Sequence, residues 1–346
     1  MTETKMLVKL GWQSFFQQQL SLDEWDSVVP ARIVEQYKSQ ITVSAESSVC
    51  TLDIVPAMPD MVVGDWILLN ADLRFVRLLE RKTCFSRKAA GSKLKQQLIS
   101  ANIDVAFIVT SMNDDFNLNR IERFLSLVNE AGAEAVIVLS KSDLEHGPES
   151  YIEQIRSLDP LLAVETVNCL DIGELAKLQP WLREGSTCVM LGSSGVGKST
   201  LTNTLTGTEL QTTSEIRADD SKGRHTTTRR SLVGVANGGL ILDTPGMRGL
   251  QLSDCKSGIK STFNDIDMFS GECQYNNCQH LGEPACRVQQ AIKDGELDQR
   301  RLKNYQKLLS EEARNSASLS EKRANDKALG KYYKNTQSQA SKFKGR

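Results

Sequence analysis

The sequence lacks long apolar runs, internal repeats and a net excess of charge of either sign. Its 346 residues include 42 Lys or Arg and 43 Asp or Glu, which gives a net charge of −1. No apolar run approaches the roughly 18 residues of a membrane-spanning helix, and the polar residues 1–5 do not begin a signal peptide. Nothing recurs at a fixed period, which excludes a repeat array. We therefore expect a globular, cytoplasmic chain of two or three domains with no membrane partner.

Histidine is scarce, with 3 residues, and the 8 cysteines are unevenly placed. Three cysteines lie close to one histidine in the segment from Cys273 to Cys286. The other cysteines are scattered, mostly among apolar neighbours: Cys50, Cys84, Cys169, Cys188 and Cys255. This distribution favours one metal site and reduced thiols in the core over a framework of disulfides.

Residues 192–199 read G-S-S-G-V-G-K-S, which fits the phosphate-loop pattern G-x-x-x-x-G-K-[ST]. An apolar strand over residues 187–191 and a helix over residues 198–206 are predicted on either side. Glycines let backbone N–H groups close on phosphates, Lys198 reaches the β and γ oxygens, and Ser199 ligates Mg²⁺. The predicted nucleotide-binding residues of this loop are Gly192, Ser193, Ser194, Gly195, Val196, Gly197, Lys198, Ser199 and Thr200.

Two switch segments are predicted after the phosphate loop. Residues 240–246 read L-I-L-D-T-P-G, in which a strand delivers Asp243 to the Mg²⁺ shell and the Gly246 N–H contacts the γ-phosphate. Residues 223–230 read G-R-H-T-T-T-R-R, a poor helix, and one threonine there completes the Mg²⁺ shell. We expect this threonine to be Thr227 or Thr228. A β-rich turn is the alternative reading of this segment.

The residue after Gly246 is Met247, where Ras-like enzymes have a glutamine that orients water. A thioether cannot orient water in that way, so the catalytic group must come from elsewhere. We expect His225, beside the switch threonines, to act in catalysis together with Lys198 and Gly246. A structural or RNA-contacting role for His225 stays open.

Ser140, Lys141, Ser142 and Asp143 resemble the guanine-reading motif N-K-x-D and follow an apolar strand at residues 135–139. The Asp143 carboxylate accepts from guanine N1–H and the exocyclic amine, which disfavours an ATP-dependent enzyme, while the Lys141 stem covers the base. We expect serine in place of asparagine to weaken the contact near guanine N7 and the tie to the phosphate loop. Ordinary GTPases have this motif after the phosphate loop, so the sequence predicts a circular permutation.

The sequence predicts an α/β protein of three regions. In residues 1–90, short β-rich runs separated by turns favour a small barrel of the oligonucleotide-binding (OB) type, or a barrel that is only a structural cap. Residues 91–256 alternate apolar strands with amphipathic helices, as in a parallel sheet covered on both faces, and form the permuted phosphate-loop GTPase domain. Residues 257–346 form a mostly helical, metal-binding module with a basic tail. Residues 87–93 are predicted to be a linker.

The third region contains the pattern Cys273-x4-Cys278-x-His280-x5-Cys286. Three thiolates and one imidazole are the closed, four-coordinate set of a structural zinc site, with no open position for catalysis. A group of free thiols is the alternative. We expect one structural Zn²⁺ per chain, bound by these four residues, and we expect the module to need the metal to fold.

Residues 314–346 carry nine Lys or Arg against only two acids, Glu321 and Asp326, and have few large apolar side chains. This composition is typical of a basic tail rather than of a core element. The tail is either a solvated extension or a contact for nucleic acid, and both readings stay open.

The motifs occur in the order S-K-S-D, G-S-S-G-V-G-K-S-T, G-R-H-T-T-T and D-T-P-G-M-R. With this order the chain resembles, over nearly its whole length, the circularly permuted, ribosome small-subunit-dependent GTPase A family (RsgA, also called YjeQ). Other segments that look like the family are residues 62–66, 87–91 and 109–117, and Cys278-x-His280 with Glu283-Pro284. Ser140 and residues 167–171 depart from the family's pattern.

The resemblance implies a GTP hydrolase that binds the small ribosomal subunit late in its assembly, is stimulated by it, and leaves after hydrolysis. Its implied partners are GTP or GDP with Mg²⁺, and ribosomal RNA contacted by the barrel and the zinc module; we expect a monomer. The alternative is an RNA-binding scaffold with a structural, slowly hydrolysing nucleotide site, which Ser140 and Met247 favour. Turnover of GTP and ATP with and without small subunits separates the two.

Overall fold

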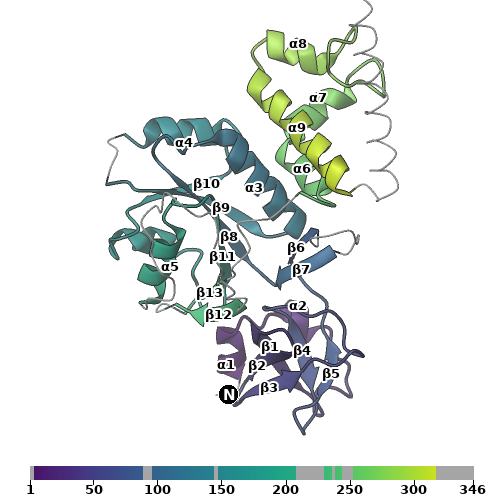
Figure 1. Ribbon diagram of the computed structural model, residues 1–346, viewed down its shortest axis with the longest axis vertical. Coiled ribbons are helices and arrows are strands. Elements are labelled where there is room, and N and C mark those ends of the chain that lie inside the picture. The colour runs from purple at the N-terminus through teal and green to yellow at the C-terminus, as the bar shows by residue number, and fades with distance from the viewer. Residues whose placement is uncertain are drawn as a thin grey trace, which may run out of the picture.

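The computed structural model describes residues 4–88, 96–143, 147–207, 230–235, 238–243 and 252–316. Three regions follow one another along its long axis: a β-rich region with the N-terminus, a central region of helices and strands, and a helical region (Figure 1). The mixed α/β fold predicted from the sequence is confirmed. Within the described ranges, no helix combines the length and the apolar character needed to cross a membrane. The domain limits at residues 90 and 256 stay predictions.

The N-terminal region is an antiparallel sheet in the order β3-β2-β1-β4-β5, accompanied by two short helices. Its elements are α1 (Thr4–Lys9), α2 (Ser14–Gln17), β1 (Val29–Gln36), β2 (Gln40–Ala45), β3 (Val49–Asp53), β4 (Trp66–Leu69) and β5 (Phe75–Leu78). Strand β4 is buried on both sides: Ile67 and Leu69 join a core with β1 and β2, whereas Trp66 and Leu68 pack with Phe16 of α2. The predicted β-rich region is confirmed, and its closure into a small barrel stays a prediction.

The central sheet has five parallel strands in the order β10-β9-β8-β11-β13, and β12 pairs antiparallel with β13. These strands are β8 (Val105–Ser111), β9 (Glu134–Ser140), β10 (Ala163–Val167), β11 (Thr187–Leu191), β12 (Arg230–Gly234) and β13 (Leu240–Asp243). Side chains of β8 alternate between two cores, with Ala106 and Ile108 in one and Val105, Phe107 and Val109 in the other. Both faces of the sheet are therefore buried, as the apolar runs predicted.

Helices supply both of these cores. Residues of α3 (Leu118–Ala131) and α4 (Glu149–Arg156) join one core, and residues of α5 (Lys198–Thr206) and the 3-10 helix η1 (Glu174–Leu178) join the other. Helix α3 begins where the Asn117 side chain accepts from the Arg120 N–H at 3.1 Å. It ends at Gly132, whose φ of 78° is left-handed. The predicted helix at residues 198–206 is confirmed.

Strand β12 connects the central sheet to the N-terminal region. It pairs antiparallel with β1, where Ser231 lies opposite Glu35, so the 11 strands form one sheet. The Arg230 guanidinium at the start of β12 donates to the carbonyl oxygens of Leu98 and Ile99 at 3.2 and 3.0 Å. Strand β12, to which the switch segment predicted at residues 223–230 leads, is therefore held by β1 on one side and by β13 on the other.

A second, two-stranded sheet consists of β6 (Cys84–Lys88) and β7 (Gln96–Ala101). The predicted linker at residues 87–93 was wrong at its first two positions, because Arg87 and Lys88 are the last paired residues of β6. Their extended pairing with β7 could not be read from the basic, polar sequence. Residues 89–93 of that prediction lie outside the described part of the chain.

The C-terminal region consists of α6 (Lys256–Thr262), α7 (Asn264–Gly271), α8 (Arg287–Lys293) and α9 (Gln299–Ser316). Phe263, Ile266 and Leu302 belong to the same continuous core as residues of α3. Helix α6 approaches α3 closely because Gly258 has no side chain: a Cβ there would lie 2.1 Å from the Ser126 carbonyl oxygen. The C-terminal region is thus packed directly on the central one.

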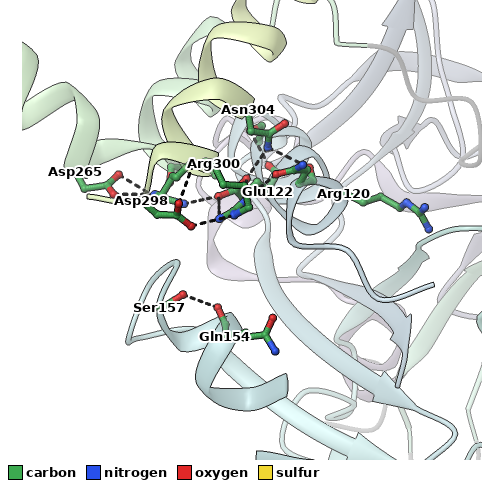
Figure 2. A network of polar contacts seen from close by, with 12 residues as sticks. Arg120, Glu122, Gln154, Ser157, Asp265, Asp298, Arg300 and Asn304 are labelled. Atoms are coloured by element: carbon green, nitrogen blue, oxygen red, sulfur yellow. Dashed lines mark hydrogen bonds and ion pairs between the residues drawn. The ribbon is translucent and has the colours of Figure 1, made fainter. Parts of the chain in front are cut away.

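A buried polar network holds α9 against α3 (Figure 2). The Glu122 carboxylate of α3 is completely buried and accepts from Arg301 at 2.8 Å, Arg300 at 2.9 Å and Asn304 at 2.5 Å. Arg301 also donates to the two carboxylate oxygens of Asp265, on α7, at 2.7 and 2.9 Å. The network therefore joins three helices from two regions through charge-assisted hydrogen bonds.

Candidate nucleotide site and metal cluster

The phosphate-loop sequence lies between the carboxyl end of β11 and the start of α5. Gly192 has a φ of 141°, and a Cβ there would lie 2.2 Å from the Val109 carbonyl oxygen, so only glycine fits. Gly197, with a φ of 95°, precedes the first turn of α5. Strand, loop and helix thus have the order that a phosphate-binding loop requires, with backbone N–H groups at the helix start.

Lys198, the first residue of α5, reaches back across the loop. Its Nζ donates to the carbonyl oxygen of Gly192 at 2.8 Å and to that of Ser193. Ser199 and Thr200 follow on the first turn and are half-buried, whereas Ser194 and Gly195 are exposed. An ammonium group and the N-terminal end of a helix therefore lie together, which favours binding of an anion.

Asp243, the predicted ligand for Mg²⁺, ends β13 beside the phosphate loop. The preceding residue, Leu242, pairs with Val189 of the parallel strand β11. Because parallel strands end at the same edge of a sheet, Asp243 lies at the edge where the loop begins. The other predicted switch and catalytic residues lie outside the described residues, and their roles stay predictions: His225, Thr227, Thr228 and Gly246.

Ser140 ties the guanine-reading segment to the phosphate loop. It ends β9, is completely buried, and its hydroxyl donates to the Val196 carbonyl oxygen at 2.7 Å. The Thr110 carbonyl oxygen lies farther away, at 3.3 Å. Although serine is shorter than the asparagine usual at this position, it keeps one hydrogen bond to the loop.

Lys141, Ser142 and Asp143 follow β9 as an irregular segment. Lys141 has a φ of 62°, and Asp143 is exposed. Burial, and to a smaller degree the negative charge of Asp143, raises the pKa of the Cys169 thiol to about 11. Asp143 is therefore close enough to Cys169 for its charge to act on the thiol.

The loop after β10, which the sequence left unassigned, packs against α5. The Cys169 carbonyl oxygen accepts from the Thr204 hydroxyl at 2.8 Å, and the Cys169 Sγ lies 3.5 Å from the position of a Cβ on Gly197. The Asn168 side chain accepts from the Leu170 N–H at 3.0 Å, which makes a tight turn. Asparagine after an apolar strand was the available signal for this turn.

Arg120 is a second residue at the loop that the sequence motifs do not predict. From the first turn of α3, its Nη1 donates to the Ser193 hydroxyl at 2.5 Å and to the Asp115 carboxylate at 2.8 Å. No local pattern predicts this contact. It arises because β8, which leads to α3, lies next to β11 in the sheet.

The predicted metal ligands Cys273, Cys278, His280 and Cys286 lie together, with one ligand atom of each within 4.8 Å of the others. The Sγ atoms of Cys273 and Cys286 lie 3.7 and 3.5 Å from His280 Nδ1 and 4.0 Å from each other. Such separations suit atoms that share one tetrahedral ion. The three cysteines and the histidine therefore form a group that could hold a metal, as predicted.

Neighbouring groups orient the histidine of this cluster and order its loop. His280 Nε2 lies 3.0 Å from the Ser270 hydroxyl, which leaves Nδ1 facing the thiols. Burial lowers the pKa of His280, which favours the neutral form that binds metals. Hydrogen bonds from its own N–H and from those of Gln279 and Leu281 lower the pKa of Glu283 to about 2. The surroundings thus fit a structural metal site.

The geometry defines the class of protein. The segment predicted to read guanine, at the end of β9, meets a phosphate loop that comes later in the chain, at the carboxyl edge of a parallel sheet. This is the arrangement of a circularly permuted phosphate-loop GTPase.

Two solved structures have a similar fold. YjeQ from Thermotoga maritima aligns with a TM-score of 0.60 and 24% identity, over 82% of this chain and 98% of that one. YloQ, described as a circularly permuted GTPase, aligns with a TM-score of 0.59 and 26% identity, over 82% and 94%.

The family follows from comparison of sequences. The family model described as RsgA GTPase matches residues 78–253. A curated protein of Vibrio parahaemolyticus serotype O3:K6 (strain RIMD 2210633), named small ribosomal subunit biogenesis GTPase RsgA 2, is 51% identical over 336 residues. The match covers 97% of this chain and 94% of that protein. The chain belongs to the RsgA GTPase family and is a GTPase, as its motifs predicted.

Proposed function

We propose that this chain hydrolyses GTP in the late assembly of the small ribosomal subunit, binds ribosomal RNA, and is released after hydrolysis. One observation carries the nucleotide part of the proposal: the hydrogen bond from Ser140 to Val196, which joins the guanine-reading segment to the phosphate loop. The name of the relative from Vibrio parahaemolyticus supports the ribosomal part.

In the proposed site, residues 192–200 bind the phosphates and Asp143 reads the guanine edge. Lys198, which already faces the loop carbonyls, would neutralise charge on the β and γ oxygens. The Lys141 stem would cover the base, and the Gly246 N–H would contact the γ-phosphate. The exposure of Asp143 supports its role, because a base can reach the carboxylate without rearrangement of the core.

Mg²⁺ bound with GTP would supply positive charge to the phosphate oxygens. Ser199 on α5 and Asp243 at the end of β13 start from the same sheet edge, which supports both as members of its shell. Thr227 or Thr228 would complete the shell, and His225 would orient the attacking water. These roles agree with the motifs, and each role can be tested by mutation of the residue concerned.

We propose Zn²⁺ for the C-terminal cluster, because thiolate and imidazole ligands in a closed set of four favour zinc. The metal would be structural, one per chain. The N-terminal and C-terminal regions and the basic tail would contact ribosomal RNA. The chain would act as a cytoplasmic monomer. The connection of β12 to β1 and of α9 to α3 supports a route by which bound RNA would influence the nucleotide site.

The test is steady-state turnover of GTP and ATP by the full chain, with and without purified small subunits. We expect intrinsic GTP hydrolysis on the order of 10⁻² per second or slower, and a strong rise with small subunits. His225→Ala should remove most of the rise and leave GTP binding intact. Equal turnover of ATP, or no response to small subunits, would overturn the proposal. RNA binding without GTP turnover would favour the scaffold alternative.

A further inference from the structure

Arg120 connects helix α3 to the phosphate loop. A single nitrogen of its guanidinium, Nη1, donates to both the Ser193 hydroxyl and the Asp115 carboxylate, at 2.5 and 2.8 Å. The side chain is 38% exposed, so the contact is only partly screened by water. Ser193 is the second residue of the loop and is half-buried. The loop is therefore tied to an element outside the strand and helix that flank it.

The same loop residue also meets the ammonium group of the site. The carbonyl oxygen of Ser193 accepts from Lys198 Nζ, while the Ser193 hydroxyl accepts from Arg120. Two cations thus hold one residue from two directions. A shift of Ser193 would displace an acceptor of Lys198, the residue proposed to bind the phosphates.

The helix that carries Arg120 has little freedom to move. Asn117 caps its first turn through the Arg120 backbone N–H, so the cap does not depend on the Arg120 side chain. Two residues later, the Glu122 carboxylate is enclosed by donors from α9. Figure 2 shows the Arg120 side chain pointing away from this network. The guanidinium therefore projects toward the loop from a base that the C-terminal region fixes.

We propose that Arg120 is a positioning residue for GTP hydrolysis. It holds Ser193 and thereby fixes the position of the phosphate loop and of the Lys198 side chain. The inference rests on the proposed role of residues 192–200 in binding phosphates. It assigns Arg120 no contact with the nucleotide. Small displacements of a positioned group can slow a reaction strongly, since a misplacement of about 1 Å can cost about 100-fold.

The experiment compares four full-length variants by kcat and KM for GTP with small subunits present, and by GDP affinity in a titration. Arg120→Ala and Ser193→Ala should each lower kcat by about 10-fold or more, with KM changed less than about twofold. The double variant should be no slower than either single variant, because both remove the same hydrogen bond. Arg120→Lys should recover most of kcat, since one ammonium can donate to both oxygens.

The matched control is Arg156→Ala, which removes an exposed arginine from α4 and should keep the original kcat. Full kcat in Arg120→Ala, or independent and additive losses in the double variant, would overturn the inference. A loss of thermal stability in Arg120→Ala large enough to explain the lower rate would also overturn it. No turnover in the unaltered chain would overturn the proposed function, and this inference with it.

Discussion

Glu122 and Arg301 form an ion pair of 2.8 Å in which the two side chains are only 0% and 4% exposed. Removal of one partner from a buried pair leaves the other charge without compensation, which typically costs about 3–5 kcal/mol. The pair joins α3 to α9, so its loss affects the attachment of the whole C-terminal region.

We therefore expect Glu122→Ala to lower the free energy of unfolding by about 3–5 kcal/mol, measured by denaturant titration. The matched control is Asp267→Ala, which removes an acid paired with Lys260 at 3.2 Å and far more exposed. That change should cost at most about 1 kcal/mol. Equal losses of unfolding free energy in Glu122→Ala and Asp267→Ala would show that burial of an ion pair does not determine the cost of its removal.

A second prediction concerns Ser140. Ser140→Ala deletes the donor to the buried Val196 carbonyl oxygen, and an unpaired buried acceptor costs about 1–3 kcal/mol. We expect GDP affinity to fall by about 10-fold, which corresponds to about 1.4 kcal/mol. Ser157→Ala is the control, because Ser157 makes the same kind of bond, to the Gln154 carbonyl oxygen at 2.7 Å, on the exposed side of the molecule. Unchanged affinity in Ser140→Ala would mean that this tie does not shape the site.

A third prediction concerns base specificity. Asp143→Asn exchanges an acceptor for a donor, so the variant should bind xanthosine diphosphate better than GDP. Because a hydrogen bond to a charged group contributes about 1.5–3 kcal/mol, GDP affinity should fall by roughly 10- to 100-fold. Competition titrations with the two diphosphates and ADP measure this. Asp159→Asn, at an exposed aspartate after α4, should leave the preference for guanine intact.

The elements that the sequence predicted share one property: their signals are local. The apolar run before Ser140 and the glycines around Lys198 identify a strand and a loop without reference to distant residues. Five parallel strands then bring their carboxyl ends to one edge, which is why the motifs meet as expected.

What the sequence did not predict depends on distant packing. In helix α3, the polar residues Glu122 and Ser126 are buried together with the apolar ones. They are covered by α6 and α9, which lie far along the chain, and no helical periodicity reveals such a cover. The Arg120 contact with Ser193 has the same origin, since strand order alone creates it.

A fourth prediction concerns the metal. One Zn²⁺ per chain should be found by metal analysis, and Cys278→Ser should lose it, whereas Cys50→Ser, on strand β3, should not. Chelation should disorder residues 264–297 first, because α7 and α8 flank the cluster while α9 is also held by Glu122. Hydrogen exchange would show which residues lose their protection when the metal is removed. Absence of zinc from protein purified without chelator would contradict this prediction.

The last prediction concerns the basic tail, whose charges should neutralise RNA phosphates and make binding depend on salt. The structure decides where the tail can be cut. Helix α9 continues to Ser316, whose hydroxyl accepts from the Asp254 N–H at 3.0 Å, and Asn315 donates to the Leu252 carbonyl oxygen at 2.7 Å. A deletion from residue 314 would therefore remove the contacts of Asn315 and Ser316, whereas deletion of residues 317–346 leaves both in place.

This shorter deletion should lower affinity for the small subunit and flatten the dependence of log affinity on log salt, by roughly 0.7 to 0.9 for each lost phosphate contact. Nucleotide affinity should not change, because every nucleotide motif lies before residue 252. The control for chain length keeps residues 317–346 and replaces each Lys and Arg among them by Gln. This variant should have the same effect as the deletion. If the truncated chain keeps the affinity and salt slope of the full chain, the tail is a solvated extension, and the contact with RNA belongs to the N-terminal and C-terminal regions.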